Sequence, residues 1–402
     1  MSFRALAGFR DFYPDEMAMR RHIEGAWHAA SKAAGFEEID GPPLESLDLF
    51  KAKSGDAIVE QLYAFVDKGE RDVALRAEFT PSLARMVGAK AASLRQPIKW
   101  YCVPQLFRYE RQQRGRLREH FQWNVDIMGS DLPSADAELL SVGLDGLRRL
   151  GLTSEHIYVR VNHRAVVERK LLELGFAEAQ LDQVLRFIDK EELESEKAVE
   201  ALDPARREAL IAWMKEPVEP EGELAQFLEA CRDYGIEDYV DIDRNIVRGL
   251  AYYTGIVFEI FDRQRSLRAV AGGGRYDGLI EKLGGPAMPA VGFGMGDVVL
   301  GELLKEKGLL PPDDGRLDDL VVPIGDDMLG AARQVVRRLR DAGRRAEAPL
   351  TAIRMGKAFK AAEAAGAERV VLIGPDEWAD GSVKVKNLAT GEQATLKLEA
   401  LA

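Results

Sequence analysis

The segment that begins at Arg248 combines residue types that could act on an anionic substrate. It reads RGLAYYTGIVFEIF and, after a polar interlude, AVAGGGRYDGL. Its first part joins Arg248 to the pair Tyr252 and Tyr253 and to an alternating apolar pattern, which predicts a cation and two phenols beside a sheet. Tyrosine pairs most often pack in a core, and the neighbouring arginine is what favours a site here. The glycine run from Gly272 to Gly274 leaves room for a ligand to approach the backbone closely.

A second candidate region is the basic segment FRYERQQRGRLR, residues 107–118, with HFQWNVD shortly after it. Most arginine runs are solvated charged loops. Apolar and aromatic residues flank these arginines on both sides, which favours strands at a sheet. A guanidinium such as that of Arg108 suits a phosphate, because its donors meet two oxygens at once. Alternate residues of a strand share a face, so four polar side chains are expected to point together: His120, Gln122, Asn124 and Asp126.

Two further segments have simple alternative interpretations. LRAEFT, residues 75–80, would ordinarily be a buried strand with a surface glutamate. GFGMG, residues 292–296, could be a dinucleotide-binding loop, but a ribose-binding acid about 20 residues further on is not convincingly present. Both segments gain significance in combination with the first two regions.

Together these segments resemble the signature motifs of histidyl-tRNA synthetases, a family of class II aminoacyl-tRNA synthetases. RGLAYY resembles the family's RGLDYY, AGGGRYDGL its glycine cluster followed by RYDGL, and LRAEFT its LRPEGT element. FRYER, the loop and HFQWNVD resemble motif 2, and GFGMG resembles motif 3. The region from Leu317 resembles the anticodon-binding domain, including the ending GSVKVKNLATGEQ. The resemblance covers nearly the full length of the chain.

The resemblance implies a role for each candidate residue. Two cations would be catalytic, one on each side of the α-phosphate of ATP: Arg248 and Arg108. Histidine would be bound by Glu78, Thr80, Gln122, Asp126, Arg248, Tyr252 and Tyr253. ATP would be bound by Arg108, Glu110, His120, Gly294 and Gly296. The acceptor end of the tRNA would be bound by Arg111, Gln113, Arg114 and Arg116.

Physical chemistry supports several of these roles. A carboxylate such as Glu78 suits the α-ammonium group of an amino acid. A pocket selective for histidine must engage both imidazole nitrogens, because an unmatched buried donor or acceptor costs about 1 to 3 kcal/mol. By resemblance, Asp126 takes one ring nitrogen and Tyr253 the other. Arg248 would stabilise the transition state in which the amino-acid carboxylate attacks the α-phosphate.

Some positions depart from the family pattern, namely Ala77, Phe79, His120, Asp126, Ala251 and Val299. His120 replaces a phenylalanine, so its imidazole is expected to stack on adenine. Asp126 replaces a glutamate, and Ala251 replaces an aspartate. Val299 replaces the arginine that usually covers the nucleotide at the end of motif 3, and Arg275 or another nearby cation could take its place.

The function implied is that of a histidyl-tRNA synthetase. Histidine and ATP would form histidyl-adenylate, with Mg²⁺ accompanying the nucleotide, and the aminoacyl group would pass to tRNA(His). Pro42 falls where motif 1 carries its dimer-interface proline, so a homodimer is expected. One alternative is a catalytically inactive regulatory subunit of ATP phosphoribosyltransferase, although such proteins typically lose the RGLDYY-like motif and the anticodon domain. Another is a tRNA-sensing protein without chemistry, which only the missing motif 3 arginine supports.

The composition of the 402-residue chain, 46% hydrophobic and 30% charged, is that of a soluble globular protein of two or three domains. No apolar stretch reaches the roughly 18 residues of a membrane span and no signal peptide is recognisable, so a cytoplasmic location is expected. Two scattered cysteines, Cys102 and Cys231, and five scattered histidines argue against a disulfide framework or a metal site. The formal charge of −12 is unusual for a nucleic-acid binder, but a basic patch can lie on an acidic body.

Strands and helices must position these residues. Strands are predicted at 74–80, 98–110, 120–128 and 239–246, and helices at 15–34, 134–150 and 297–307. Several strands with few crossover helices predict an α+β fold, in which helices flank a mostly antiparallel sheet like that of class II synthetases. Helical spacing over 166–232 predicts an insertion between two catalytic parts, 1–165 and 233–310. Alternating strands and helices over 317–402 predict a small α/β domain, the anticodon-binding domain by resemblance.

Overall fold

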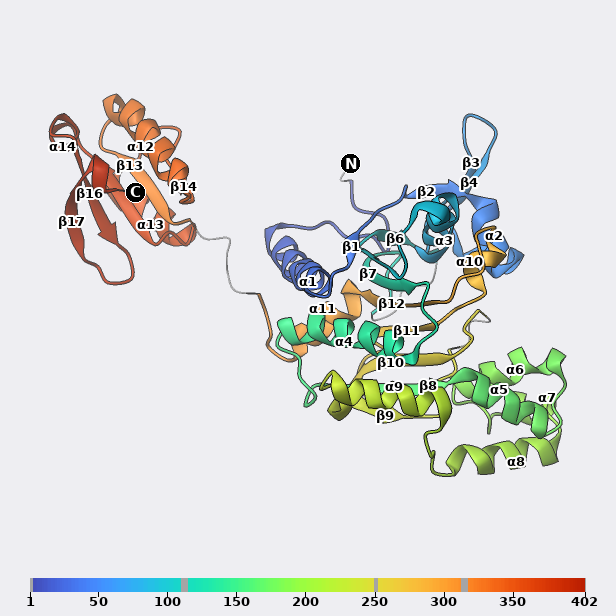
Figure 1. Cartoon of the computed structure of the whole chain (residues 1–402). Coiled ribbons are helices and arrows are strands. Elements are labelled where there is room, and N and C mark those ends of the chain that lie inside the picture. Colours follow the sequence, from blue (N-terminus) through green and yellow to red (C-terminus); the bar gives the residue numbers. More distant parts are fainter. Residues whose placement is uncertain (1–2, 110–114, 249–251, 312–316, 402) are drawn as a thin grey trace. The chain divides into compact units, whose positions relative to one another are not determined.

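The structure is a computed structural model that describes residues 3–109, 115–248, 252–311 and 317–401. The chain forms two compact units, Met1–Leu310 (unit 1) and Pro311–Ala402 (unit 2), which are described separately (Figure 1). A few residues singled out from the sequence lie outside the described ranges: Glu110, Arg111, Gln113, Arg114 and Ala251.

Unit 1 is built on a nine-stranded sheet with the order β1-β5-β7-β12-β11-β10-β8-β9, in which β6 also pairs with β7. The pairs β1 with β5 and β8 with β9 are parallel, and the other pairs are antiparallel. The predicted α+β class with a mostly antiparallel sheet is confirmed. The strands are β1 (Glu37–Glu38), β5 (Ile98–Cys102), β6 (Gln105–Phe107), β7 (Glu119–Met128), β8 (Ile157–His163), β9 (Val240–Ile242), β10 (Ile256–Asp262), β11 (Ala271–Arg275) and β12 (Ala290–Gly296).

Long helices cover one face of this sheet, and their apolar side chains form the main core with alternate strand residues. Trp27, Trp123, Phe227 and Phe258 lie fully buried in this core. The helices are α1 (Pro14–Ala33), α4 (Pro133–Arg149), α9 (Gly222–Asp233) and α11 (Asp297–Glu306). The opposite face carries α3 (Thr80–Lys90) and α10 (Leu279–Lys282), which pack around a second core.

The helices predicted at 15–34, 134–150 and 297–307 are confirmed as α1, α4 and α11, with ends that agree to about one residue. Pro14 starts α1 and acidic residues occupy its first turn, as expected where a fixed φ and a negative charge favour a helix start. Strong helical periodicity with a start signal was therefore sufficient for these elements.

Three predicted strands differ from the structure. The strand predicted at 74–80 is β4 (Asp72–Leu75), and Thr80 instead begins α3, where Pro81 in the first turn is suited to a helix start. The strand predicted at 98–110 is divided into β5 and β6 at Pro104, which has no N–H group for a ladder. The strand predicted at 239–246 is only β9, and the residues that follow it form a turn.

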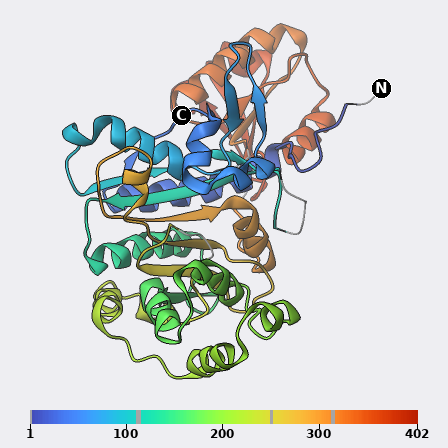
Figure 2. The ribbon, with the colours of Figure 1, turned by 90° about the vertical axis from the view of Figure 1, so that its right-hand side faces the viewer.

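Two smaller structures complete unit 1. A three-stranded sheet in the order β2-β4-β3 pairs β4 with β2 (Leu44–Ser46) and β3 (Ala64–Val66), and α2 (Leu47–Ser54) follows β2. Beyond β8, four helices surround a core of their own (Figure 2), and we call them the helical insertion. They are α5 (Arg164–Glu173), α6 (Glu178–Asp189), α7 (Glu196–Ala201) and α8 (Pro204–Lys215). The next helix, α9, packs in the main core instead.

Unit 2 is a five-stranded sheet in the order β14-β13-β15-β16-β17, with parallel pairing at β13 and antiparallel pairing at β16. Its strands are β13 (Asp319–Pro323), β14 (Ala346–Glu347), β15 (Arg369–Ile373), β16 (Ser382–Asn387) and β17 (Gln393–Lys397). Its helices are α12 (Leu329–Asp341), α13 (Met355–Ala364) and α14 (Pro375–Ala379). Apolar clusters lie on both faces of the sheet, which confirms the predicted small α/β architecture.

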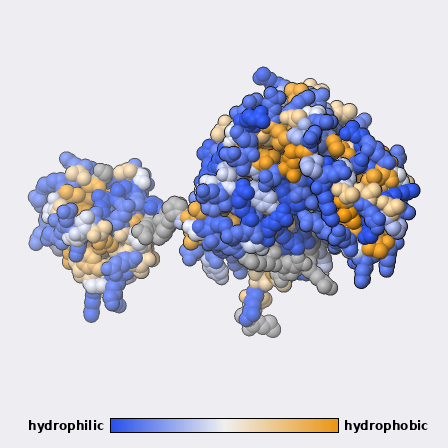
Figure 3. Space-filling view, turned by 90° about the horizontal axis from the view of Figure 1, so that it is seen from below, coloured by the Kyte–Doolittle hydropathy of each residue, from blue (hydrophilic) through white to orange (hydrophobic). Residues whose placement is uncertain are grey.

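The face seen in Figure 3 is largely hydrophilic, with hydrophobic groups gathered in small patches. Over the described ranges, no helix has the length and apolar character needed to cross a membrane.

Candidate active site

A cleft of about 660 Å³ lies over the glycine-rich strands β11 and β12, within the size range of small-molecule sites. Most of the predicted site residues that the structure describes line it: Glu78, Arg108, Arg116, His120, Gln122, Arg248, Tyr252, Gly294 and Gly296. Three do not reach its surface. Asp126 and Tyr253 are buried, and Thr80 lies at the start of α3.

Alternate positions of β12 are glycines, and two of them, Gly294 and Gly296, line the cleft. Gly292 and Gly294 lie on the same face of the strand. A Cβ on Gly292 would lie 2.0 Å from Oδ1 of Asp126. A Cβ on Gly294 would lie 2.8 Å from the side chain of Gln122. The polar side chains of β7 can therefore lie across β12 only because these positions lack side chains. GFGMG lies within strand β12, so it does not form a dinucleotide-binding loop.

Arg248 lies across β11 in the same way. Its Nη1 donates to Oε1 of Glu259 at 2.5 Å, and a Cβ on Gly272 would lie only 1.8 Å from that nitrogen. The backbone of Arg248 is in the left-handed region, with φ of 49°, which is uncommon outside glycine. Burial opposes the charged form, but the neighbouring Tyr253 and Glu259 raise the pKa of the guanidinium above its ordinary value. The site thus holds a permanent cation in a fixed and strained position.

Asp126, one of the predicted histidine-binding residues, carries a buried carboxyl group. Asp126 accepts a hydrogen bond of 2.5 Å from the hydroxyl of Tyr276. Burial raises the pKa of Asp126 to about 7, although the Tyr276 hydroxyl and Lys53 act to lower it. The rings of Tyr252 and Tyr253 lie 4.6 Å apart beside this group, and burial raises the pKa of Tyr252 to about 12. Protonated phenols beside a carboxyl group can meet both the donor and the acceptor of an imidazole ring.

Glu78 is paired with a lysine that the motifs did not indicate. The ammonium group of Lys53, whose side chain is 1% exposed, contacts Oε2 of Glu78. The same ammonium lies over the ring of Tyr252, 4.2 Å from its centroid. One oxygen of Glu78 is therefore held in place by a charge-assisted hydrogen bond at the cleft wall.

The predicted ATP-binding side contains Arg108 and His120. Arg108 follows β6, and its Nε donates to the carbonyl of Ala77 at 3.0 Å, which directs the guanidinium along the cleft. Burial, together with the charges of Arg108 and Arg10, lowers the pKa of His120 to about 3. The imidazole is therefore neutral near pH 7 and can stack on a base without adding charge.

Comparison with known proteins identifies the family that carries this site. A family model described as histidyl-tRNA synthetase matches residues 8–296, and one described as anticodon binding domain matches residues 319–402. The histidine–tRNA ligase of Opitutus terrae is 41% identical, over 99% of this chain and 97% of that protein. A chloroplastic and mitochondrial histidine–tRNA ligase of Arabidopsis thaliana is 41% identical, over 98% of this chain and 85% of that protein. A histidyl-tRNA synthetase structure from Nostoc has the same fold, with a TM-score of 0.84, 24% identity and coverage of 100% of this chain and 98% of that one.

The chain belongs to the histidyl-tRNA synthetase family. The predicted family and fold are thereby confirmed, and with them the predicted class of enzyme, a histidine–tRNA ligase. The alternative of a non-catalytic regulatory subunit is not favoured.

The place of the missing motif 3 arginine is apolar in this synthetase. Val299 lies in the first turn of α11 and lines the cleft with Val298. Asp297, which precedes them, accepts from the N–H of Phe121 at 2.9 Å and pairs with Arg10 at 2.9 Å. This aspartate therefore fastens the start of α11 to β7 and to the N-terminal segment.

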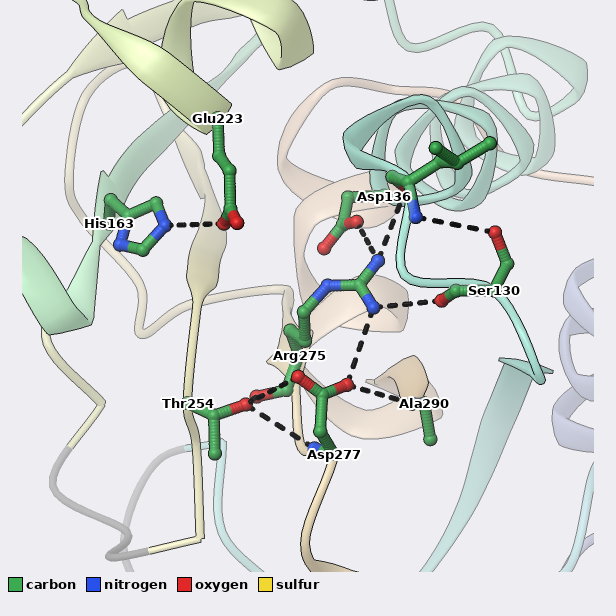
Figure 4. A network of polar contacts seen from close by, with 9 residues as sticks. Ser130, Asp136, His163, Glu223, Thr254, Arg275, Asp277 and Ala290 are labelled. Carbon is green, nitrogen blue, oxygen red and sulfur yellow. Dashed lines mark hydrogen bonds and ion pairs between the residues drawn. The ribbon is translucent and has the colours of Figure 1, made fainter. Parts of the chain in front are cut away.

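Arg275 does not take the place of that arginine. It is 5% exposed, it contacts Asp136, and its Nη1 donates to the carbonyl of Ser130 at 2.8 Å (Figure 4). Nη1 also donates to Asp277 at 3.3 Å, and Asp277 in turn accepts from the N–H of Ala290 at 3.0 Å. These contacts tie β11 to α4 and β12, so the expectation that Arg275 serves the nucleotide is not supported.

Sequence reasoning missed Lys53, Glu259 and Arg268, which all line the cleft. Glu259 carried a usable signal, because it is the one acid within the apolar run IVFEIF. Lys53 and Arg268 lie in segments without any motif, and only the folded chain brings them to the site.

Proposed function

We propose that histidine activation takes place in this cleft. The carboxylate of histidine attacks the α-phosphate of ATP, histidyl-adenylate forms, and diphosphate leaves. The observation that carries the proposal is Arg248, held over Gly272 by Glu259 in a cleft that Arg108 also lines. Negative charge grows where nucleophile and leaving group meet at phosphorus, and fixed cations there stabilise the transition state more than the ground state.

Histidine is selected by the buried end of the site. Asp126 accepts from one imidazole nitrogen and Tyr253 serves the other, with Gln122 and Tyr252 lining the pocket. Support comes from the burial of Asp126 and Tyr253, since an amino acid without matching groups would leave part of their hydrogen-bonding capacity unused, beyond the bond that Asp126 accepts from Tyr276, at a cost of about 1 to 3 kcal/mol. Glu78 receives the α-ammonium group through the oxygen that Lys53 does not hold.

ATP lies with its adenine against the neutral imidazole of His120 and its phosphates toward Arg108 and Arg248. Mg²⁺ would accompany the nucleotide, since this ion keeps several waters and takes one or two protein carboxylates beside the phosphates. Glu259 is a cleft carboxylate suited to that contact. The ion would neutralise part of the phosphate charge.

The acceptor end of tRNA(His) approaches through the segment after Arg108. Arg116 lines the cleft and supports this, whereas the assignments of Glu110, Arg111, Gln113 and Arg114 stay predictions. Unit 2 reads the anticodon, for which its family match is the support. A homodimer formed near Pro42, a cytoplasmic location and the domain limits 1–165, 166–232, 233–310 and 317–402 also stay predictions.

One assay tests the proposed reaction. Purified protein should exchange radioactive pyrophosphate into ATP when histidine is added, and no other amino acid should replace histidine. A chain that ends at Leu310 should keep this exchange and lose efficient charging of tRNA, because unit 1 is compact by itself. Absence of histidine-dependent exchange in the intact protein contradicts the proposal, and full charging by the short chain contradicts the role of unit 2.

A further inference from the structure

Three consecutive residues before the tyrosine pair lie in three different environments. Ile246 is buried with Tyr253 in the core on the cleft side of the sheet. Val247 is fully buried in the core of the helical insertion. The side chain of Arg248 lies in the cleft. A displacement of the insertion would therefore pull on the residue directly before Arg248.

Arg164, the first residue of the insertion, holds this junction through the backbone. Its side chain is 3% exposed, and its Nη1 donates to the carbonyl of Val247 at 3.3 Å and to that of Arg248 at 2.8 Å. Its Nε donates to Glu168 at 2.8 Å, one turn along α5, so the guanidinium is fixed from the insertion side. The N–H of Arg164 donates to the carbonyl of Gly255 at 2.9 Å, which anchors the start of α5 to the chain that leads into β10.

Two successive carbonyls held by one guanidinium orient the peptide planes on both sides of Arg248. These planes define φ and ψ of the residue, and the φ of 49° is a conformation that an L-residue rarely keeps without outside contacts. The direction of the Cα–Cβ bond, and with it the path of the guanidinium over Gly272, follows from that backbone. The contacts of Arg164 are of the kind that can maintain this strained conformation.

A second arginine ties the same junction to the far side of the insertion. Arg244 donates to the carbonyls of Trp213, at 2.6 Å, and Glu216, at 2.5 Å, at the end of α8. The segment between β9 and Arg248 is thus attached to α5 and to α8. Its position depends on the insertion as a whole.

We propose that Arg164 is a positioning residue for histidine activation, which sets the backbone of Arg248 and couples the helical insertion to the cleft. The inference rests on the proposed role of Arg248. Arg164 is not among the residues that line the cleft, and its described contacts include backbone carbonyls, Glu168 and, at 3.9 Å, Asp182.

The test compares Arg164→Gln and Arg164→Lys in the full chain. Single-turnover formation of histidyl-adenylate should slow about 10 to 100-fold in Arg164→Gln, the range expected when a reacting group is displaced by about 1 Å. The KM values for histidine and ATP should change by less than about threefold, because only the transition-state contact is lost. Arg164→Lys keeps a donor and a charge, so its rate of adenylate formation should lie between the rates of Arg164→Gln and the wild type.

Arg207→Gln is the matched control. Arg207 also donates to a carbonyl of the insertion, that of Leu193 at 3.4 Å, and it is remote in sequence from the junction. This variant should lose stability while its rate of adenylate formation stays within about threefold of wild type. A similar loss of rate in Arg207→Gln would mean that any damage to the insertion slows the reaction, and it would overturn the specific role of Arg164.

Two further outcomes would overturn the role of Arg164. A folded Arg164→Gln variant with the wild-type rate overturns the inference, and if that variant does not fold, an unchanged rate in Arg164→Lys does the same. The control Arg248→Ala distinguishes a failure of the proposed function from a failure of the coupling through Arg164. If Arg248→Ala reacts normally, the proposed function of the cleft fails; if it is inactive while Arg164→Gln is normal, only the coupling fails.

Discussion

Two arginines from the same pair of signature segments, Arg248 and Arg275, have opposite environments. Arg275 contacts the carboxylates of Asp136 and Asp277, and it donates to carbonyls in the loop before α4. Arg248 is paired with one carboxylate, Glu259, and lines the cleft. Its backbone is in the left-handed region.

The difference indicates that Arg275 stabilises the fold, as a scaffold arginine, whereas Arg248 is available to a substrate. A guanidinium whose two terminal nitrogens are both directed to protein acceptors stabilises the fold but has little capacity left for a substrate. A guanidinium held by one carboxylate at the edge of a cleft can turn its remaining donors to a phosphate. Gly272 makes room for the cleft arginine, because Arg248 occupies the space that a side chain at position 272 would fill.

The largest effect is expected from breaking the scaffold arginine. Arg275→Met leaves the fully buried Asp136 without its partner and should lower the free energy of unfolding by about 3 to 5 kcal/mol. Urea unfolding followed by circular dichroism measures this change. Adding Asp136→Leu should restore part of the loss, since it removes the unpaired buried charge. An Arg275→Met protein as stable as wild type would contradict the scaffold role.

Removal of the cleft arginine should affect the rate and spare the stability. Arg248→Ala should reduce kcat for histidine-dependent pyrophosphate exchange about 10² to 10³-fold, the usual loss for one preorganised contact to the transition state. Glu259, 21% exposed, can then be hydrated, so the unfolding free energy should change little. Equal kcat values for variant and wild type would show that the two arginines do not differ in the way proposed.

A methyl group on the cleft floor should have a smaller effect. Gly272→Ala places a Cβ 1.8 Å from the present Nη1 of Arg248, so the guanidinium must move and kcat should fall about 10 to 100-fold. Gly278→Ala is the control, since a Cβ there meets nothing within 4 Å. If both variants lose the same activity, the close approach of Arg248 to β11 is not what the glycine serves.

The remaining effect is a dependence of stability on pH, which is spread over about three pH units. Burial raises the pKa of Asp126 from 3.8 to about 7, so the folded protein binds a proton that the unfolded chain has released between these values. Stability should therefore fall as pH rises from about 4 to about 7, by at most about 1.4 kcal/mol per pH unit, and this contribution should be constant above pH 7. Urea unfolding of Asp126→Asn should lack this slope relative to wild type. Parallel curves for both proteins would contradict the protonated carboxyl.

Much of this architecture could be predicted where the pattern is local. Periodicity and start signals are sufficient for α1, α4 and α11, and alternation in HFQWNVD correctly brings His120, Gln122 and Asp126 to one face of β7. The family motifs predicted residues that are far apart in the sequence, and most of those that the structure describes line one cleft.

The remainder depends on contacts between distant segments. Lys53 meets Glu78 only after α2 has docked beside α3, and no local pattern reports a pair 25 residues apart. A strand was predicted to continue through Thr80, but Thr80 begins α3, with Pro81 in its first turn. The apolar pattern of LRAEFT does not indicate this helix start. In the sequence, Arg164 has no feature that distinguishes it from other helix residues. Its role depends on carbonyl partners that are 83 and 84 residues away.

The most direct test of the account is a crystal structure of the protein with histidyl sulfamoyl adenosine, a stable mimic of histidyl-adenylate. The account predicts the imidazole between Asp126 and Tyr253, the α-ammonium group at Glu78, and the sulfamoyl group between Arg108 and Arg248. A mimic bound with its sulfamoyl group remote from Arg248, or with its imidazole away from Asp126, would contradict the assignment of the cleft.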